Sequence, residues 1–592
     1  MVLTDEQRRA VRHNEHTLLT ACPGSGKTRA LAAKLINCLE EVRGTPRRIA
    51  CITYTNPAVY EIEDRLKTYG SAGDEDSCDI STIHSFCLAN ILQNFYWHIP
   101  EYRSGFRVLP SDSERYRELV EAVCGEYGIQ QQFRVYFENI GREPDGSPVE
   151  IQGISSDAIK AFWDMLLKEG YIDFSNIIYY TYRLMLESPE ITDAIACRYA
   201  WILVDEFQDT SALQVEILKL IADRKITKFF LVGDPHQSIY GFAGTRRELM
   251  DDFASHLGAE RGFKLLTNFR SSRPIICHAE KLCPREPPMT AGGKSAHFTE
   301  EPRYIHCTNA FDAITDYFLP ALNEMKISYG ESAILAPWWV KLLQVGRQLR
   351  DYGVPIIGPG ARPYRRNHLF ALLAEQICAY IEQQDPKIFY NIERELFLLI
   401  SNATGSVDFK VYSYHGRVAV MKLINCGIEL KEKCGNGVVW LKEASQEFSE
   451  ILMADGFLTA AGSELIKESV AGMELDMKNN GVDTDNLSVS NLGMFANSDK
   501  SMKLLTMHRA KGREFDAVAI IDLHERRVPH FSATTDEAVD EYRRLLYVSI
   551  TRARRLLMYM TDEESAWNRP SRFLGSEGLD LTPDNISLGG IT

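Results

Sequence analysis

The sequence predicts an α/β protein with two regions in which buried strands alternate with helices. The first observation is a Gly-rich loop, Ala21–Thr28, which joins an apolar strand-like run to a segment of helical periodicity. The second is the apolar run Trp201–Val204, which leads directly into the carboxylates Asp205 and Glu206. The third is the return of strand and helix patterns after residue 500, beyond a long helical stretch. Two α/β regions, each interrupted by a mainly helical insertion, account for this order.

The Gly-rich loop has the composition and the context of a phosphate-binding loop. The run Thr17–Thr20 precedes it as a strand, and apolar residues from Ala30 to Leu39 follow at helical spacing. Backbone N–H groups and the positive end of the helix dipole favour phosphate at such a turn. We expect the loop to hold a nucleoside triphosphate through Ala21, Cys22, Pro23, Gly24, Ser25, Gly26, Lys27 and Thr28.

Within this loop, Lys27 would reach the β- and γ-phosphates, and Thr28 would place its hydroxyl on Mg²⁺. Ala21 stands where the usual pattern has its first glycine, so the alternative is a glycine turn followed by a chance Gly-Lys-Thr. Because Cys22 lies inside the loop, we also expect thiol modification to affect activity.

The composition limits the classes of protein to which this chain can belong. At 592 residues, the chain is long enough for three or four domains. It has no apolar run as long as a membrane span, its first residues lack the regions of a signal peptide, and its 13 cysteines show no paired spacing. These features predict a cytoplasmic protein with no membrane partner. The net charge of −15 argues against a basic coat, but local basic stretches leave room for a nucleic-acid groove.

The order of the patterns predicts the domain boundaries. Strand-like runs at Ile49–Asn56 and Asp79–Phe86 end in polar residues, and a helical pattern then interrupts the first α/β region. We therefore expect a first α/β domain at 1–86 and 176–262 with an insertion at 87–175, a second at 263–375 and 500–575 with a compact insertion at 376–499, and a C-terminal tail at 576–592.

A series of motifs occurs in the order seen in UvrD/Rep-type superfamily 1 helicases. The segments are Gln7, ACPGSGKT, ITYTNPAVYEI, STIHSFC, VDEFQDT, VGDPHQSIYGFAG, NFRS, TMHRAKGREF and YVSITRAR. They cover both α/β regions, and together they make the resemblance highly specific. The resemblance implies two RecA-like P-loop NTPase domains with parallel sheets, each carrying a mainly helical inserted subdomain. It also implies that the protein binds ATP and Mg²⁺ and moves 3′ to 5′ along single-stranded DNA.

The same resemblance implies roles at the nucleotide. The expected catalytic residues are Glu206 as the general base, Gln237 as the γ-phosphate sensor, and Arg270 and Arg552 as arginine fingers from the second α/β region. The expected Mg²⁺ ligands are Thr28 and Asp205, and the expected nucleoside contacts are Gln7, Arg29 and Phe269 at adenine and Glu514 at ribose. Gln7 also fits a helix capping box with Thr4, three residues earlier.

The DNA contacts implied by the resemblance are polar and aromatic residues at the ends of strands. They are Thr53, Tyr54, Asn56, Thr82, His84, Tyr240, Phe242, Thr506 and His508. Stacking of a base on an aromatic ring is worth about 1–3 kcal/mol and tolerates any sequence, although core packing is an equal alternative for any single aromatic residue. Phe242-Ala243-Gly244 stands where the family commonly has Trp-Arg-Gly, which predicts a weaker grip on DNA or one shared with a partner.

Three functions stay open from the sequence. The first is an ATP-dependent helicase or translocase that acts on single-stranded and partly duplex DNA. The second is a DNA-stimulated ATPase subunit that regulates a partner nuclease, because small UvrD-like subunits of phage-defence systems, such as the Gabija helicase paired with an ATPase–nuclease, resemble this organisation. The third is a P-loop ATPase unrelated to nucleic acid, for which the strand-end motifs would be coincidental.

Overall fold

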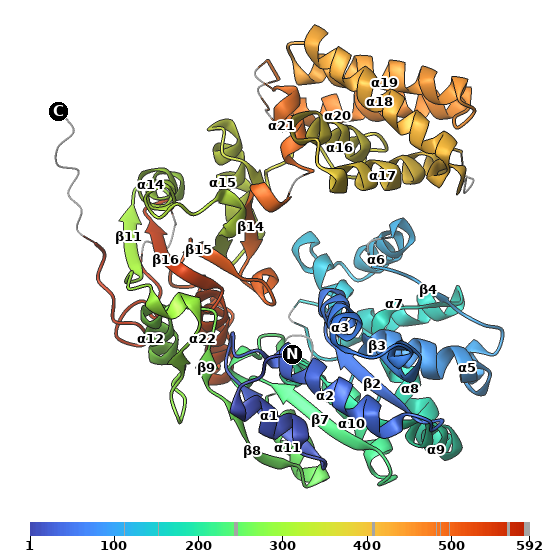
Figure 1. Ribbon diagram of the computed structural model, residues 1–592, viewed down its shortest axis with the longest axis vertical. Helices are drawn as coiled ribbons and strands as arrows, with labels where there is room; N and C mark the ends of the chain where they lie inside the picture. Colours follow the sequence, from blue (N-terminus) through green and yellow to red (C-terminus); the bar gives the residue numbers. More distant parts are fainter. Residues whose placement is uncertain are drawn as a thin grey trace. The chain divides into compact units, whose positions relative to one another are not determined.

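The computed structural model describes residues 1–111, 113–151, 153–241, 247–404, 409–480, 482, 484–485, 487–496, 498–564 and 569–584. Residue contacts divide the chain into two units, Met1–Phe298 with Thr535–Val548, and Thr299–Thr534 with Ser549–Thr592 (Figure 1). In the described residues, each unit contains one six-stranded sheet in which all the neighbouring strands are parallel. The predicted α/β class with two parallel sheets is therefore confirmed.

The sheet of the first unit has the strand order β3-β2-β6-β7-β1-β8. Its strands are β1 (Thr17–Ala21), β2 (Arg48–Thr53), β3 (Cys78–Thr82), β6 (Tyr199–Val204), β7 (Lys228–Gly233) and β8 (Glu260–Leu265). The short strands β4 (Arg107–Val108) and β5 (Tyr171–Ile172) form one separate pair, and β9 (Thr267–Asn268) and β10 (Thr290–Ala291) form another. Because the six strands are parallel, the residues that follow β1, β6 and β7 meet at one edge of the sheet.

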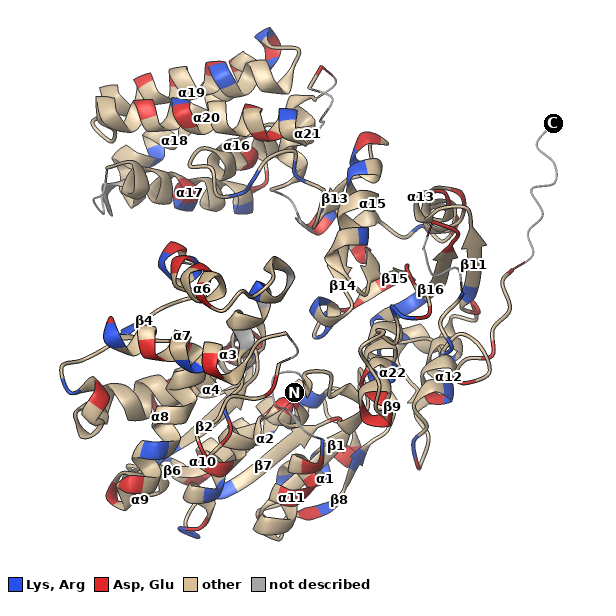
Figure 2. Cartoon of the chain, turned by 180° about the vertical axis from the view of Figure 1, so that it is seen from behind, with Lys and Arg blue, Asp and Glu red and all other residues tan. Residues whose placement is uncertain are grey.

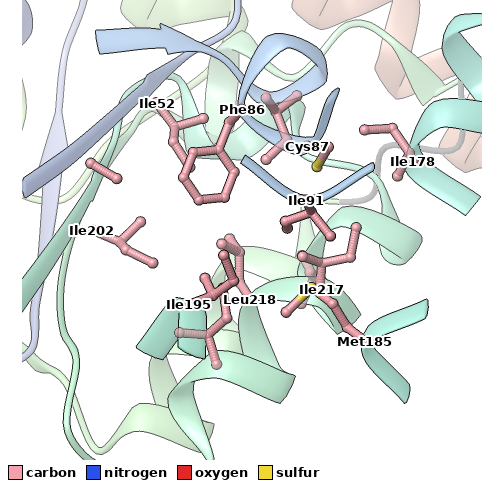
Figure 3. Close-up of a cluster of buried hydrophobic side chains, with 14 of the residues drawn as sticks. Ile52, Phe86, Cys87, Ile91, Ile178, Met185, Ile195, Ile202, Ile217 and Leu218 are labelled. Carbon is pink, nitrogen blue, oxygen red and sulfur yellow. The ribbon is translucent and has the colours of Figure 1, made fainter. Parts of the chain in front are cut away.

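Helices cover both faces of this sheet. They are α1 (Asp5–Arg12), α2 (Lys27–Val42), α3 (Asn56–Tyr69), α4 (Ile83–Cys87), α5 (Gln93–Phe95), α8 (Phe174–Glu187), α9 (Pro189–Arg198), α10 (Ala212–Ala222) and α11 (Glu248–Leu257). Two further helices belong to this unit, α12 (Arg273–Leu282) and α22 (Asp536–Ile550), the latter up to Val548. Alternate strand residues point to opposite faces, so Ile52 and Ile202 join the cluster in Figure 3 while Cys51 and Leu203 join the core on the other side. Both faces of the sheet are thus buried, as is typical of a parallel sheet.

The helical part of the first unit has its own core. Helices α6 (Glu114–Glu126) and α7 (Ser156–Lys168) contribute Leu119, Val123, Phe162 and Leu166 to a separate buried cluster. This cluster lies inside the range expected for the first insertion.

The sheet of the second unit has the strand order β11-β16-β15-β12-β14-β13. Its strands are β11 (Arg303–Cys307), β12 (Ser332–Ala336), β13 (Ile356–Ile357), β14 (Met502–Thr506), β15 (Phe515–Ile520) and β16 (Ala553–Asp562). Its helices are α13 (Ala310–Ala313), α14 (Leu319–Glu324), α15 (Trp339–Asp351), α16 (Ala371–Gln383), α17 (Pro386–Thr404), α18 (Tyr414–Lys433), α19 (Gly437–Ala454), α20 (Ala460–Asn479) and α21 (Val489–Met494). Helices α16–α21 enclose a separate core around Trp440 and Phe448, which begins at Tyr364, before the start expected for the second insertion at residue 376.

Two local expectations differ from the structure. The strand expected at Asp79–Phe86 ends at Thr82, because the Thr82 hydroxyl accepts a hydrogen bond from Ser85 N and begins α4 there. The boundary expected at residue 263 lies inside β8, which pairs with β1 and belongs to the first sheet. Residues up to Phe298, together with most of α22, also belong to the first unit. The four-part division of the chain stays a prediction.

Charge is distributed as the composition suggests. Figure 2 shows acidic and basic residues interspersed on the helices of both units. Among the described residues, no helix combines the length and the apolar character needed to cross a membrane.

Phe86 offers a direct test of the core in Figure 3. Its side chain is fully buried, and its ring lies 5.5 Å from that of Tyr199. Phe86→Ala should lower the free energy of unfolding of the first unit by about 3–5 kcal/mol, because it leaves a cavity. Tyr60→Ala, at a position of the same unit with 62% exposure, should change it by less than about 0.5 kcal/mol. Urea titration measures both, and equal effects would contradict this packing.

Candidate nucleotide-binding site

The Gly-rich loop lies between β1 and the first turn of α2, as predicted. Cys22 N donates a hydrogen bond to Leu265 O in β8 (2.9 Å). Ser25 Oγ donates to Cys22 O (2.7 Å), which closes the turn from inside. Gln7 Nε2 donates to Ser25 O (2.9 Å), so α1 holds the loop from the other side. These bonds fix the loop while its N–H groups remain at the helix N-terminus.

Two positions in the loop require glycine. Gly24 and Gly26 have φ angles of +67° and +81°, which disfavour other residues. A Cβ atom on Gly24 would also lie 2.5 Å from Cβ of Arg270. This close approach is stabilised by the bond from Phe269 N to Gly24 O (2.9 Å) and by Asn268 Oδ1, which accepts from Arg270 N (2.8 Å). The NFRS segment therefore packs directly on the loop.

This packing corrects one expectation. Arg270 was expected to come from the second α/β region, yet the structure places it in the same unit as the phosphate loop. The strand β8 pairs with β1, and the residues that follow it lie against the loop at Gly24. Arg552 does lie in the second unit, where Nη1 donates to Arg513 O (3.2 Å) and the side chain is 2% exposed.

Carboxylates from the ends of β6 and β7 surround Lys27. Lys27 Nζ lies 3.1 Å from Glu206 Oε2. Burial lowers the pKa of Lys27, but the charges of Glu206, Asp234 and Asp205 outweigh it and the net shift is upward. Burial raises the pKa of Asp205 to about 7, with the charge of Glu206 as the next cause. Glu206 has a φ of +48°, a strained conformation of the kind found at functional sites.

A chain of hydrogen bonds joins Glu206 to Gln237. Gln208 Nε2 donates to Glu206 Oε2, and Gln208 Oε1 accepts from Asp234 N (2.9 Å). Asp234 Oδ2 accepts from Gln237 Nε2 (2.7 Å). The expected base and the expected γ-phosphate sensor are thus held in one network through two residues, Gln208 and Asp234, that the sequence analysis did not assign.

The residues present fit a magnesium ion. Asp205 is a buried carboxylate whose pKa is raised by burial and by the charge of Glu206, although Lys27 opposes the shift, and Thr28 offers a hydroxyl in the first turn of α2. The described residues contain no group of three or more His, Cys, Asp or Glu side chains placed to hold a metal. Mg²⁺ needs no such group, because it is commonly held by one or two carboxylates together with nucleotide phosphates.

The other expected nucleotide contacts are placed as follows. Gln7 forms the capping box with Thr4 and also bonds the loop, so contact with adenine would require it to exchange these bonds. Arg29 and Phe269 are exposed. Glu514 lies in the second unit, where it pairs with Arg554 (2.7 Å). These four assignments stay predictions.

The expected thiol sensitivity at Cys22 does not fit the structure. Its side chain is fully buried, and burial raises its pKa to about 12. Because the thiolate is the reactive form, the structure indicates an inert thiol at this position.

The strand-end residues of the first unit lie at the same edge of its sheet. Thr53 pairs in register with Thr82, and the rings of Tyr54 and Tyr240 stack with centroids 5.4 Å apart. The hydroxyl of Thr53 donates to Thr55 O, so it stabilises the turn between β2 and α3. The DNA-binding role of these residues stays a prediction.

Two histidines, His84 and His508, are among the residues expected to contact DNA, and both are neutral. Burial lowers the pKa values of His84 and His508 to about 4, so both rings are uncharged at neutral pH. His84 packs edge-on against Phe174, an aromatic residue with 45% exposure that the sequence analysis missed. Asn56 is exposed at the start of α3, and Thr506 ends β14 in the second unit. Phe242 lies outside the described residues.

An ion pair on α3 was also missed. Arg65 Nη2 lies 2.5 Å from Glu61 Oε1, and the charge of Glu61 contributes to raising the pKa of Asp205. The sequence signal for this ion pair was the spacing of Glu61 and Arg65 by one helical turn, shortly after the end of β2.

Comparisons with known proteins agree with this geometry. Residues 3–257 match the family model of the UvrD/REP helicase N-terminal domain, and residues 463–564 match that of the UvrD-like helicase C-terminal domain. The chain is 26% identical to the ATP-dependent DNA helicase PcrA of Staphylococcus epidermidis, over 98% of this chain and 87% of that protein. It is 24% identical to DNA helicase II of Rickettsia typhi, over 99% and 96%.

Asp205→Asn should stabilise the magnesium-free protein at high pH. The folded pKa of Asp205 is raised, so the stability that its protonated form contributes is fully present below its usual pKa of 3.8 and is lost progressively as pH rises from there to about 7. The neutral amide avoids that loss. With EDTA present, the free energy of unfolding of the variant, relative to that of the wild type, should be higher at pH 8.5 than at pH 5.5 by about 1 kcal/mol or more, because the loss in the wild type is only partial at pH 5.5.

Asp79→Asn is the matched control. Asp79 is half-buried and pairs with Arg48 (2.6 Å), and its pKa is lowered because bonds from Arg48 and Tyr199 outweigh burial. Asp79 is ionised at both pH values, so its variant should be destabilised about equally at each. A pH-independent effect of Asp205→Asn would contradict the burial argument.

Proposed function

Because this chain belongs to the UvrD/Rep family of helicases, we propose that it is an ATP-dependent DNA helicase that translocates 3′ to 5′ on single-stranded DNA. The observation that carries the proposal is the convergence of the phosphate loop, the carboxylates after β6 and the Asp234–Gln237 segment after β7 at one sheet edge. The relatives named above are described as ATP-dependent DNA helicase and DNA helicase II, which supports the same activity. A role in DNA repair and a cytoplasmic location belong to this proposal.

Each residue at this edge has a chemical task in the proposal. Lys27 and the loop N–H groups bind the β- and γ-phosphates, and Thr28 and Asp205 hold Mg²⁺, which neutralises phosphate charge when it is bound. Glu206 orients the attacking water and accepts its proton. Gln237 contacts the γ-phosphate.

Two arginines complete the proposed site from different units. Arg270 acts beside the loop, and Arg552 acts as an arginine finger from the second unit. Because hydrolysis then needs residues of both units, the nucleotide state can drive movement along DNA.

The proposed substrate is single-stranded or partly duplex DNA, bound without regard to sequence. The stacked rings of Tyr54 and Tyr240 and the neutral histidines suit contacts with base faces and sugars rather than with one base edge. The alternative is a DNA-stimulated ATPase that regulates a partner nuclease, as in Gabija-type defence systems. Phe242-Ala243-Gly244, which replaces the family's usual Trp-Arg-Gly, is the observation that favours it.

The first test separates nucleotide binding from hydrolysis. Lys27→Ala should abolish turnover by removing phosphate contacts, with ATP affinity reduced in parallel. Glu206→Gln should keep nucleotide affinity while turnover falls by about 100-fold or more, because only the base is lost. Steady-state ATPase assays and equilibrium nucleotide titrations measure the two effects. Near-wild-type hydrolysis by Glu206→Gln would show that the base is another residue.

The second test concerns DNA. Single-stranded DNA should stimulate ATP hydrolysis with little sequence preference and a steep salt dependence, because phosphate contacts dominate such binding. Tyr54→Ala should raise the DNA concentration needed for half-maximal stimulation by about 5- to 100-fold. Tyr69→Ala, also exposed but at the other end of α3, should leave it unchanged.

Strand displacement, assayed beside ATPase activity on tailed duplexes, separates the candidate functions. The helicase separates strands behind a 3′ tail. DNA-stimulated hydrolysis without displacement would favour the regulatory ATPase, and no DNA stimulation at low salt would contradict both.

A further inference from the structure

An arginine outside all the quoted motifs is buried beside the nucleotide site. Arg285 follows α12, and its Nη2 lies 2.5 Å from Asp234 Oδ1 and 2.7 Å from the hydroxyl oxygen of Tyr547. The Arg285 side chain is 9% exposed and that of Asp234 is 0% exposed. The Nε atom of Arg285 is buried without a hydrogen-bond partner in the described part of the chain. All three residues belong to the first unit.

A buried ion pair of this kind contributes little to the stability of the fold. Removing two charges from water costs several kcal/mol per ion, and an apolar pair of similar volume often serves folding as well. Burial would raise the pKa of Asp234, but the charge of Arg285 is the strongest of the opposing effects and the net shift is downward. The pair therefore maintains an ionised carboxylate in the interior, close to Lys27.

The Asp234 carboxylate is the centre of the hydrogen-bond network. It accepts from Gln237 Nε2 (2.7 Å) and from His236 N (3.1 Å). The backbone N–H of Asp234 donates to Gln208 Oε1, and Gln208 Nε2 in turn donates to Glu206. The orientation of Gln237 thus depends on where this carboxylate is held, and that of Glu206 depends, through Gln208, on where the backbone of Asp234 is held.

Helix α22 supplies the other anchor of the same segment. Besides Tyr547, it provides Glu541 Oε1, which accepts from Gly241 N (2.9 Å). It also provides Arg544 Nε, which donates to Ser238 O (2.8 Å). The segment from Asp234 to Gly241 is therefore attached to α22 at both ends, and Arg285 forms the attachment nearest to the phosphate loop.

We propose that Arg285 is a positioning residue for ATP hydrolysis. It fixes Asp234, so that Gln237, bonded to the Asp234 carboxylate, and Glu206, linked through Gln208 to the Asp234 backbone N–H, keep their orientation toward the γ-phosphate. The inference rests on the proposed function for the roles of Gln237 and Glu206. Arg285 itself acts through Asp234 and does not contact the nucleotide.

The test compares turnover with nucleotide binding in Arg285→Ala. The kcat of ATP hydrolysis, with and without single-stranded DNA, should fall by about 10- to 100-fold, as for residues that orient a reacting group. The equilibrium affinity for a fluorescent ATP analogue should change by less than about threefold, because the phosphate loop is intact. Guanidinium ion at millimolar concentration should restore part of the lost kcat by occupying the vacated position.

Arg48→Ala is the matched control. Arg48 also forms an ion pair with a half-buried carboxylate, that of Asp79, but at the other side of the sheet. It should keep the wild-type kcat and show no response to guanidinium.

A second variant guards against loss of folding. Arg285→Gln combined with Asp234→Asn removes both charges, so no uncompensated charge remains in the interior and the fold should be retained. Its kcat should stay low, because the carboxylate that orients Gln237 is gone. A merely structural pair predicts the opposite, a double variant that recovers both stability and turnover.

Three outcomes would overturn the inference. A wild-type kcat in Arg285→Ala would show that the pair does not position the site. A parallel loss of kcat and nucleotide affinity would show that Arg285 binds phosphate itself. Recovery of turnover in the double variant would leave only a structural role. In each case the wild type still hydrolyses ATP, whereas an inactive wild type would contradict the proposed function and the inference together.

Discussion

The charge balance around Lys27 is the constraint on which the site depends. One ammonium group lies among Glu206, Asp205 and Asp234, and the last two of these carboxylates are almost fully buried. The pKa of Asp205 stays raised, because burial and the charge of Glu206 outweigh the opposing charge of Lys27. A site of this kind favours a nucleotide that brings Mg²⁺ with it, because the metal compensates the carboxylates and the loop compensates the phosphates.

The parallel sheet is what brings these groups together. The strands β1, β6 and β7 lie side by side, and each ends in a segment that carries one part of the site. Their apolar side chains bury both faces, so the polar residues can gather only where the strands end. The NFRS segment follows β8, which pairs with β1, and it places Arg270 against the phosphate loop.

The sequence predicts the local parts of this site well. Strand β1, the glycine turn and α2 follow from periodicity and from two glycines with positive φ, and the structure places them within a few residues of expectation. Long-range features are harder to predict. Nothing in the sequence near Arg285 marks it as a partner of Asp234, 51 residues away, because a lone arginine after a helix is usually a surface residue. The burial of Cys22 and the early end of β3 at Thr82 likewise depend on packing and capping that periodicity does not show.

The proposed motor is tested most directly by movement on single-stranded DNA. Oligonucleotides carrying biotin at the 3′ or the 5′ end, with streptavidin bound, report the direction in which an ATP-driven protein pushes. This account predicts that the wild type, with ATP and Mg²⁺, displaces streptavidin from the 5′ end faster than it dissociates spontaneously, and leaves it at the 3′ end. Displacement from the 3′ end, or none from either end while ATP is hydrolysed, would contradict the account.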